Sequence, residues 1–126
     1  MHIELRTGRY ERVIELRQYG LPVSVGSDAC PHPLPQPERL AALDVDGVVL
    51  PLTAERHLNA VVGVGRAALE LGLRLVVNDA GVLWALRDLK PRCVTAGRGL
   101  VHGIEACPWA DDLLRGENQQ VREALM

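Results

Sequence analysis

The sequence predicts an α/β protein whose parallel strands are joined by helical crossovers. Short apolar runs rich in β-branched residues alternate with longer segments of helical periodicity, an order typical of parallel sheets. Two of the predicted strands, at residues 46–50 and 73–77, are apolar almost throughout. Strands that are buried in a parallel sheet have this composition, because helices cover them.

The first part of the chain contains two of the strands and one helix. Residues 3–6 predict a short strand that Gly8 ends, and residues 9–19 predict a helix with apolar side chains at helical spacing. Gly20 stops this helix. The β-branched run at residues 22–26 predicts the next strand.

The middle of the chain predicts a loop, two helices and a strand. Four prolines within residues 31–37 exclude a regular helix or a central strand there. Residues 37–43 then predict a short helix with proline at its start, and residues 46–50 predict a strand. The longest helix is expected over residues 53–71, with Thr53 as its cap.

The last part repeats the alternation of strand and helix. Residues 73–77 predict a strand, residues 81–89 a helix that Pro91 closes, and residues 93–95 a further strand. Two short helical pieces are expected at 110–115 and 117–125.

Composition limits the class of protein further. The chain has 126 residues, which is the length of one domain, and 48% of them are hydrophobic, so it can build a core. With 14 basic and 16 acidic residues its net charge is −2, and there is no run of Lys or Arg. This balance, together with only 3% aromatic residues, argues against a nucleic-acid-binding surface.

Cysteine usage and hydropathy bear on the compartment. No apolar stretch is long enough to cross a membrane, and the first residues have no signal-peptide core. Both observations predict a cytoplasmic protein. Cys30, Cys93 and Cys107 are an odd number, which favours free thiols or metal ligands over disulfides. Cys93 falls in a predicted strand and is expected to be a buried thiol, whereas Cys30 and Cys107 lie in predicted loops.

Polar residues follow the predicted strands at the edge where ligands bind to parallel sheets. We expect these segments to converge on one face; as simple turn and capping residues, Ser27, Thr53 and Asp79 would have a structural role instead. The residues in question are Ser27, Asp28, Cys30 and His32 after the second strand, Thr53 after the third, Asn78 and Asp79 after the fourth, and Arg98 and His102 after the fifth.

A second pattern, Gly-Val-Gly-Arg-Ala-Ala at residues 63–68, has the form of the dinucleotide-binding fingerprint. In that interpretation, residues 59–64 form a strand and Asp79 binds a ribose. The helix that would remain is too short for a normal crossover. The alternative is a continuous helix over 53–71 whose two glycines permit close packing.

Three segments resemble peptidase family U-thirty-two, the collagenase-like peptidases and their ubiquinone-hydroxylation relatives. They are Val-Ser-Val-Gly-Ser-Asp-Ala-Cys at 23–30, Asn-Asp-Ala-Gly at 78–81 and Gly-Arg-Gly-Leu at 97–100. The resemblance covers about residues 23–100 and implies a TIM-barrel-like fold of about half the family's length. The family's peptidase signature is only echoed at residues 102–107, so peptidase activity is not implied.

The resemblance also implies roles for individual residues. It suggests Cys30 as a ligand of an iron–sulfur cluster, with Cys107 as a possible replacement for another ligand, and it places Asn78, Asp79 and Arg98 on the ligand face of the barrel.

Two functional hypotheses follow. The first is an enzyme or enzyme subunit with an iron–sulfur cluster or another metal on Cys30 and Cys107, since soft thiolates suit iron and zinc. In it, Asp79 or Glu105 is the acid–base candidate. The second is a non-catalytic module that binds a peptide or completes a partner barrel. The expected ligand-binding residues of the first hypothesis are Asp28, Asn78, Arg98 and His102.

The sequence also predicts three spatial arrangements. The sulfurs of Cys30 and Cys107 are expected to lie close together. Asp28, Asn78, Asp79 and Arg98 are expected to line one pocket, with Arg98 holding an anion. About four strands cannot close a barrel, for which eight are usual, so we expect a homodimer or a partner subunit, with residues 117–126 available for the contact.

Overall fold

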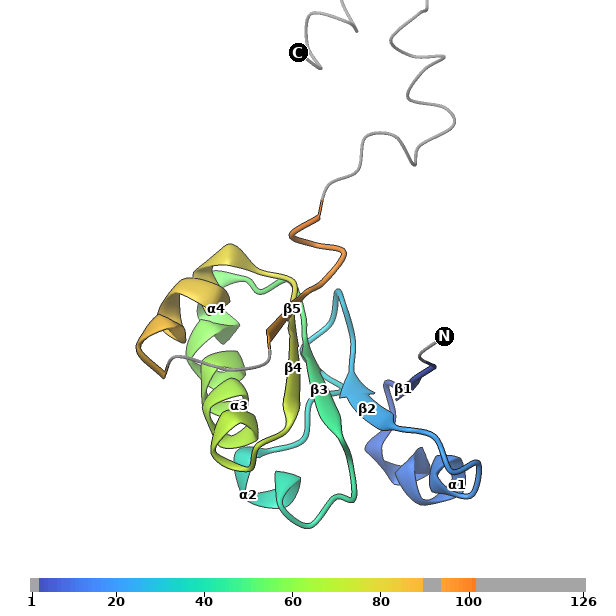
Figure 1. The fold of residues 1–126 in the computed structure, drawn as a ribbon. Helices are drawn as coiled ribbons and strands as arrows, with labels where there is room; N and C mark the ends of the chain where they lie inside the picture. Colours follow the sequence, from blue (N-terminus) through green and yellow to red (C-terminus); the bar gives the residue numbers. More distant parts are fainter. Residues whose placement is uncertain (1–2, 90–93, 102–126) are drawn as a thin grey trace, which may run out of the picture.

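The structure, a computed structural model, describes residues 3–89 and 94–101. Its five strands are all parallel and lie side by side in the order in which they occur along the chain (Figure 1). The strands are β1 (Leu5–Thr7), β2 (Val23–Gly26), β3 (Gly47–Leu50), β4 (Arg74–Val77) and β5 (Val94–Ala96). The predicted α/β class with parallel strands and helical crossovers is confirmed, with five strands rather than about four.

Helices and 3-10 turns connect consecutive strands. They are η1 (Tyr10–Arg12), α1 (Val13–Arg17), α2 (Pro37–Leu40), η2 (Glu55–His57), α3 (Leu58–Glu70), α4 (Ala80–Ala85) and η3 (Arg87–Leu89). Several predicted helices are shorter than expected, because a 3-10 turn takes over one end of each. The sequential strand order is that of a (βα)8 barrel, and the strands in the described ranges form an open sheet, so the half-barrel arrangement stays a prediction.

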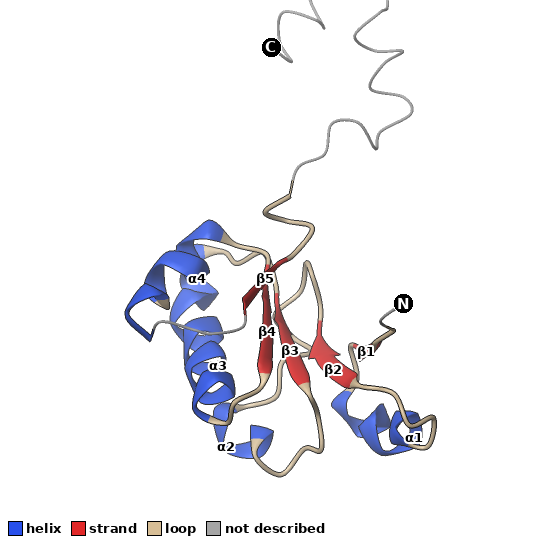
Figure 2. Cartoon of the chain, in the orientation of Figure 1, coloured by secondary structure: helices blue, strands red, loops and turns tan. Residues whose placement is uncertain are grey.

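One face of the sheet packs against the helices and forms the core (Figure 2). Successive strand residues point to opposite faces, and the apolar members of β2, β3 and β4 alternate accordingly. Side chains from α1, α2, α3 and the region of α4 join the same cluster. The strand residues in it are Val23, Val25, Val48, Leu50, Leu75 and Val77. Each such side chain stabilises the fold by roughly 1.5–3 kcal/mol when fully buried.

A polar clamp joins α1 to the residues just before β3, at the edge of the sheet where the strands begin. The guanidinium of Arg17 donates to Asp46 Oδ2 at 2.9 Å and to Asp44 Oδ1 at 2.9 Å. Asp46 Oδ2 also accepts the backbone N–H of Val23 at 2.8 Å. The clamp therefore holds the first crossover helix against the sheet with charge-assisted bonds.

Two sequence predictions about the longest helix are wrong. Thr53 does not cap it: the helical segment begins with η2, whose N-cap residue is Ala54, and the Thr53 hydroxyl donates to the carbonyl of Pro51 at 2.7 Å. Residues 59–64 are not a strand, since all of them lie in α3. The glycine pair is therefore inside a helix and lacks the strand that a dinucleotide fingerprint requires.

The alternative interpretation of the glycine pair is confirmed for Gly65 alone. A Cβ at Gly65 would lie 2.9 Å from Leu86 Cδ1 and 3.0 Å from Leu50 Cδ1, so its lack of a side chain permits close packing. A Cβ at Gly63 would meet only the ring of Pro37, at 4.0 Å. No helix in the described ranges has the length and apolar content needed to cross a membrane.

Candidate functional site

Asn78 organises the carboxyl edge of the sheet. It follows β4 directly and its relative exposure is 0%. Its Nδ2 donates to the carbonyl of Leu50 at 2.9 Å and to Asp28 Oδ1 at 3.0 Å, and its Oδ1 accepts the N–H of Gly99 at 2.9 Å. One buried amide thus joins the ends of β3 and β4 to the loops after β2 and β5. With both amide hydrogens used, Asn78 positions neighbouring groups.

Two glycines make room for this amide. A Cβ at Gly97 would lie 2.2 Å from Asn78 Oδ1, and a Cβ at Gly99 would lie 2.4 Å from the carbonyl oxygen of Asn78. Neither distance is tolerated between non-bonded heavy atoms. The Gly-Arg-Gly sequence after β5 is therefore required for packing on Asn78. The Asn-Asp-Ala-Gly and Gly-Arg-Gly-Leu motifs of the sequence thus have one structural cause.

Asp79 has two backbone partners. It is the N-cap of α4, where Oδ1 accepts the N–H of Val82 at 3.1 Å, and its Oδ2 accepts the N–H of Thr53 at 3.2 Å. These bonds tie the loop after β3 to the start of α4. The capping role considered for Asp79 is confirmed, and a catalytic role for it stays a prediction.

The loop after β2 carries the carboxylate that is best placed for a ligand. Ser27 Oγ accepts the N–H groups of Ala29 and Cys30, both at 3.3 Å, which makes Ser27 a turn residue as considered above. The carbonyl of Asp28 accepts the N–H of Leu52 at 2.9 Å. Asp28 is half-buried, and its Oδ2 has no hydrogen bond within the described part of the chain. Cys30 in the same loop is a half-buried free thiol.

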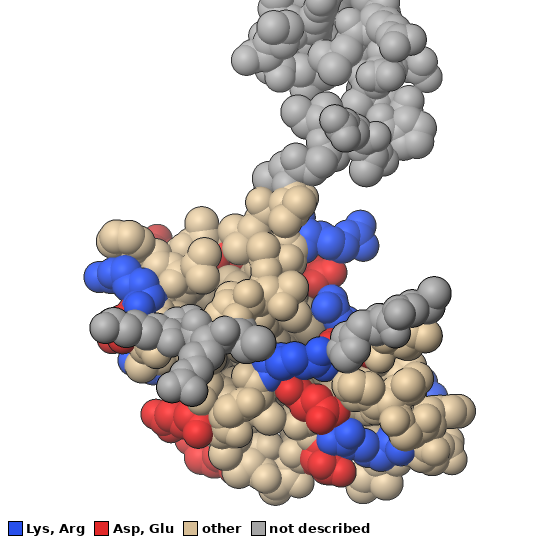
Figure 3. All heavy atoms as spheres, viewed as in Figure 1, with Lys and Arg blue, Asp and Glu red and all other residues tan. Residues whose placement is uncertain are grey.

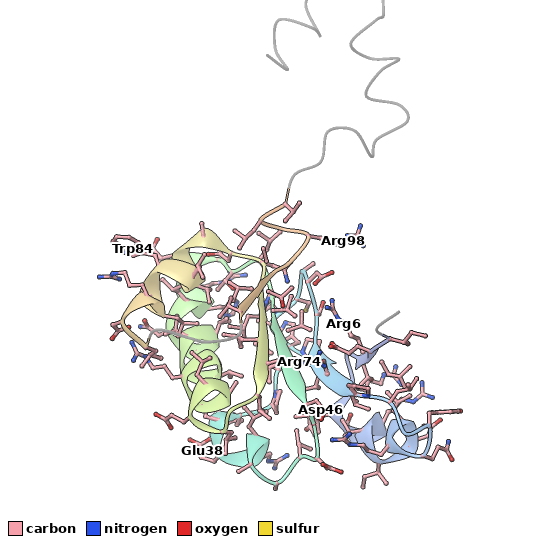
Figure 4. The ribbon with its side chains drawn as sticks, viewed as in Figure 1. Arg6, Glu38, Asp46, Arg74, Trp84 and Arg98 are labelled. Carbon is pink, nitrogen blue, oxygen red and sulfur yellow. The ribbon has the colours of Figure 1, made fainter. Side chains whose placement is uncertain are left out.

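Arg98 lies at the rim of this edge. Its backbone is anchored by the bond from Gly99 to Asn78, while its side chain is exposed and projects from the end of the sheet (Figure 4). Among the described residues it makes no ion pair. The structure therefore brings Asp28, Asn78 and Asp79 to one edge and leaves the guanidinium of Arg98 outside their hydrogen-bond network.

A charged band covers the sheet face that is turned away from the core (Figure 3). Glu4 is paired with Arg74 at 2.6 Å and with Arg6 at 3.4 Å, and these side chains come from β1, from the residue before it and from β4. Sequence reasoning missed this cluster. The signal was available, because Glu4 and Arg6 flank apolar Leu5 and Arg74 lies between two leucines, so strand alternation places all three on the other face.

A groove of about 410 Å³ lies between the proline-rich loop and α3. Its apolar wall includes Pro35, Val61 and Val64, and His32 and His57 also line it. From the sequence, His32 was expected among the residues at the carboxyl edge, and no groove was predicted. Within the described ranges, no three His, Cys, Asp or Glu side chains are arranged to hold a metal ion.

Three predicted site residues, His102, Glu105 and Cys107, lie outside the described residues. So do Cys93, which was expected to be a buried thiol, and the predicted helices at 110–115 and 117–125. The proximity of Cys30 and Cys107 therefore stays a prediction. An iron–sulfur cluster takes several thiolate ligands, and in the described ranges Cys30 is the one cysteine. Those residues by themselves do not fit such a cluster, and no chemical step is derived through it.

Comparison with known proteins adds no family. No family model, curated protein or solved structure matches this chain. The resemblance to peptidase family U-thirty-two accordingly stays a prediction.

Proposed function

We propose that this chain is a barrel-type enzyme or enzyme subunit that binds a small anionic ligand at the carboxyl edge of its sheet. The observation that carries the proposal is the Asn78 network, which joins the ends of β3 and β4 to the loops after β2 and β5. Ligands of parallel α/β proteins bind at this edge.

Two side chains at this edge have suitable chemistry. Asp28 offers a carboxylate oxygen in an orientation that Asn78 fixes, and it can accept a proton or a hydrogen bond from a ligand. Arg98 offers a planar guanidinium fork that matches a carboxylate or phosphate. Cys30, three residues after Ser27, adds a thiol from the same loop. Together with Cys107 it remains our candidate for a metal or iron–sulfur cluster.

The anion site is tested by titration of the isotope-labelled full chain with inorganic phosphate and, separately, with acetate, followed by amide chemical shifts. We expect saturable shifts around Asp28, Arg98 and Gly99. Arg98→Ala should weaken binding at least tenfold. Arg39→Ala is the matched control, since Arg39 is an exposed arginine on α2 and lies away from the carboxyl edge (Figure 1). Equal loss in both variants, or no saturable shifts, would contradict the proposal.

The metal assignment has its own test. The full chain, purified without oxygen, should contain iron and absorb visible light, and Cys30→Ser should lose both. Iron-free, colourless protein would remove the metal from the proposal and leave the anion site unaffected.

A second candidate function is a non-catalytic module that completes a barrel with a partner. The open edges of the sheet favour it: β1 and β5 each have a neighbour on one side only within the described ranges. An open parallel sheet leaves backbone donors and acceptors unpaired at both edges. A partner that supplies strands would satisfy them.

A further inference from the structure

The groove between the proline-rich loop and α3 is separate from the Asn78 network. None of Asp28, Asn78 and Arg98 lines it. Its volume of about 410 Å³ falls within the roughly 300–1,000 Å³ that is usual for small-molecule sites. The groove is therefore large enough to hold a ligand of its own.

The outer wall of the groove is formed by the proline-rich loop, which leads into α2 beside α3 (Figure 1). The rings of Pro31, Pro35 and Pro37 restrict the backbone of this wall, because each fixes its own φ. The N–H of Leu34 also donates to the carbonyl of Pro31 at 3.1 Å and closes a turn. A wall that is already ordered loses little conformational entropy when a ligand binds.

Gly63 lies in the opposite wall, and packing within the fold does not account for a glycine there. A Cβ at this position would meet only the ring of Pro37, at 4.0 Å. Glycine inside a helix lowers stability relative to alanine. Because Gly63 and Pro37 both line the groove, a side chain at position 63 would take up part of its volume. The bare backbone at Gly63 therefore keeps the groove open.

The polar groups of the groove are imidazoles and amides. Among the described residues they are His32, Gln36, His57 and Asn59. Arg56 Nε donates to His57 Nε2 at 3.1 Å. A guanidinium always keeps its protons, so Nε2 is the unprotonated nitrogen of His57 and Nδ1 carries the hydrogen. His57 can thus offer an N–H donor to a ligand.

Charge around the groove favours an anionic ligand over a cationic one. No carboxylate is among the described residues that line it. The acidic residues that flank this region in the sequence, Glu38 and Glu55, are exposed and lie outside the lining. Arg56 holds a permanent positive charge against His57, and hydrogen bonds strengthen when one partner is charged.

We propose that this groove binds a small aromatic carboxylate, with its ring against Gly63 and the proline rings and its carboxylate at His57. A glycine allows a ligand to approach the backbone closely, and proline rings pack well on aromatic ones. The proposal goes beyond the proposed function, since it adds a ligand site that shares none of the side chains of the anion site.

Phenylacetate is the probe, titrated into the isotope-labelled full chain and followed by amide chemical shifts. We expect saturable shifts at His57, Ala60 and Gly63. 2-Phenylethanol, which has the ring without the carboxylate, should bind roughly tenfold more weakly, the usual effect of losing a hydrogen bond to a charged group. Acetate, which has no ring, should give no saturable shift at Gly63.

Two outcomes of this titration overturn the proposal. One is the absence of saturable shifts at Gly63 with phenylacetate, and the other is equal binding of 2-phenylethanol. Shifts around Asp28, Arg98 and Gly99 report the anion site separately. Each site can therefore fail without the other.

Variants that fill the groove identify the wall. Gly63→Leu should weaken phenylacetate binding at least tenfold, and Ala60→Leu, at an exposed position of the same wall, is the second variant if the first does not fold. Glu70→Leu is the matched control, because it adds a leucine to an exposed position of α3 outside the groove. Circular dichroism verifies the fold of each variant. Unchanged binding in the groove variants, or equal loss in Glu70→Leu, overturns the proposal.

His57→Phe tests the position of the carboxylate. The variant keeps an aromatic ring and lacks the N–H donor, so phenylacetate should lose most of its advantage over 2-phenylethanol. An undiminished preference for phenylacetate would overturn the assignment of the carboxylate to His57.

Discussion

At the scale of single residues, the side chain of Asn78 links several segments of the fold. It is fully buried and makes three hydrogen bonds to three different segments. Removal of its amide leaves a buried carbonyl at Leu50 and a backbone N–H at Gly99 without partners, and an unsatisfied buried group costs about 1–3 kcal/mol.

We therefore expect Asn78→Ala to lower the free energy of unfolding by roughly 2–4 kcal/mol in urea denaturation. Asn59→Ala is the control, since Asn59 is exposed on α3, and it should change the value by less than about 0.5 kcal/mol. If the two variants were equally stable, the Asn78 network would not be what holds the loops.

Glu15 gives a prediction about pH. The hydrogen bond from Arg12 and the charge of that guanidinium lower the pKa of Glu15 below its ordinary value of 4.5. A carboxylate with a depressed pKa in the folded state contributes stability above its unfolded pKa, and that contribution is lost as the pH falls through the folded value. The carboxyl signal of Glu15 should therefore titrate below pH 4.5.

The comparison that isolates this pair is Arg12→Ala, in which the pKa of Glu15 should rise. Because both groups are exposed, added salt should reduce the difference between the two proteins. An unchanged titration midpoint in Arg12→Ala would show that the pair does not form in solution.

At the scale of elements, α3 allows a test with two neighbouring glycines. Both cost the helix intrinsic stability, by roughly 0.5–1 kcal/mol relative to alanine. Gly63 has room for a methyl group, so Gly63→Ala should raise the free energy of unfolding by up to about 1 kcal/mol. A methyl group at Gly65 would press on Leu86 and Leu50.

Gly65→Ala should consequently lower stability by roughly 1–3 kcal/mol, the usual cost of overpacking. Thermal unfolding of the two variants under the same conditions makes the comparison. Stabilisation by both would show that the contact between α3 and the sheet is looser than the structure describes.

Most elements were predictable from the sequence because each has a local cause. The strands β3 and β4 are apolar runs, and glycines and prolines mark the ends of neighbouring segments. The start of the longest helix was not predictable from Thr53, because the Thr53 hydroxyl donates to the carbonyl of Pro51 within the loop. Local patterns do not show whether a hydroxyl will accept a helix N–H as a cap or donate to a carbonyl of its own loop.

The candidate site was predictable in part. Polar residues at strand ends pointed to the carboxyl edge of the sheet and included Asp28 and Asn78, which the structure joins. Their roles were not predictable, since burial of Asn78 depends on how closely the β5 loop approaches it. A side chain at position 97 would clash with that amide, and this clash depends on tertiary packing, which hydrophobic periodicity does not reveal.

At the scale of the whole molecule, local stability should be highest at the centre of the sheet and lowest at its edges. β3 and β4 share a four-residue register and lie under α3, whereas β1 and β5 have three residues each and an open outer side in the described ranges. Native-state hydrogen exchange reports local opening.

We expect the amides of β3 and β4 to exchange most slowly and those of β1 and β5 to exchange at least tenfold faster at low protein concentration. Asp46→Ala, which removes the acceptor of the Val23 N–H, should accelerate exchange in β1 and β2 more than in β4. Uniform protection across all five strands would contradict a sheet with weakly held edges.

The sequential strand order has a consequence for how the chain acquires its structure. Each strand pairs with the strands immediately before and after it in the sequence, so no pairing waits for a distant part of the chain. Closing short loops costs less entropy than closing long ones, and local pairing is associated with fast folding. A nascent chain can therefore add one strand and its helix at a time during synthesis, and every addition leaves a template for the strand that emerges next.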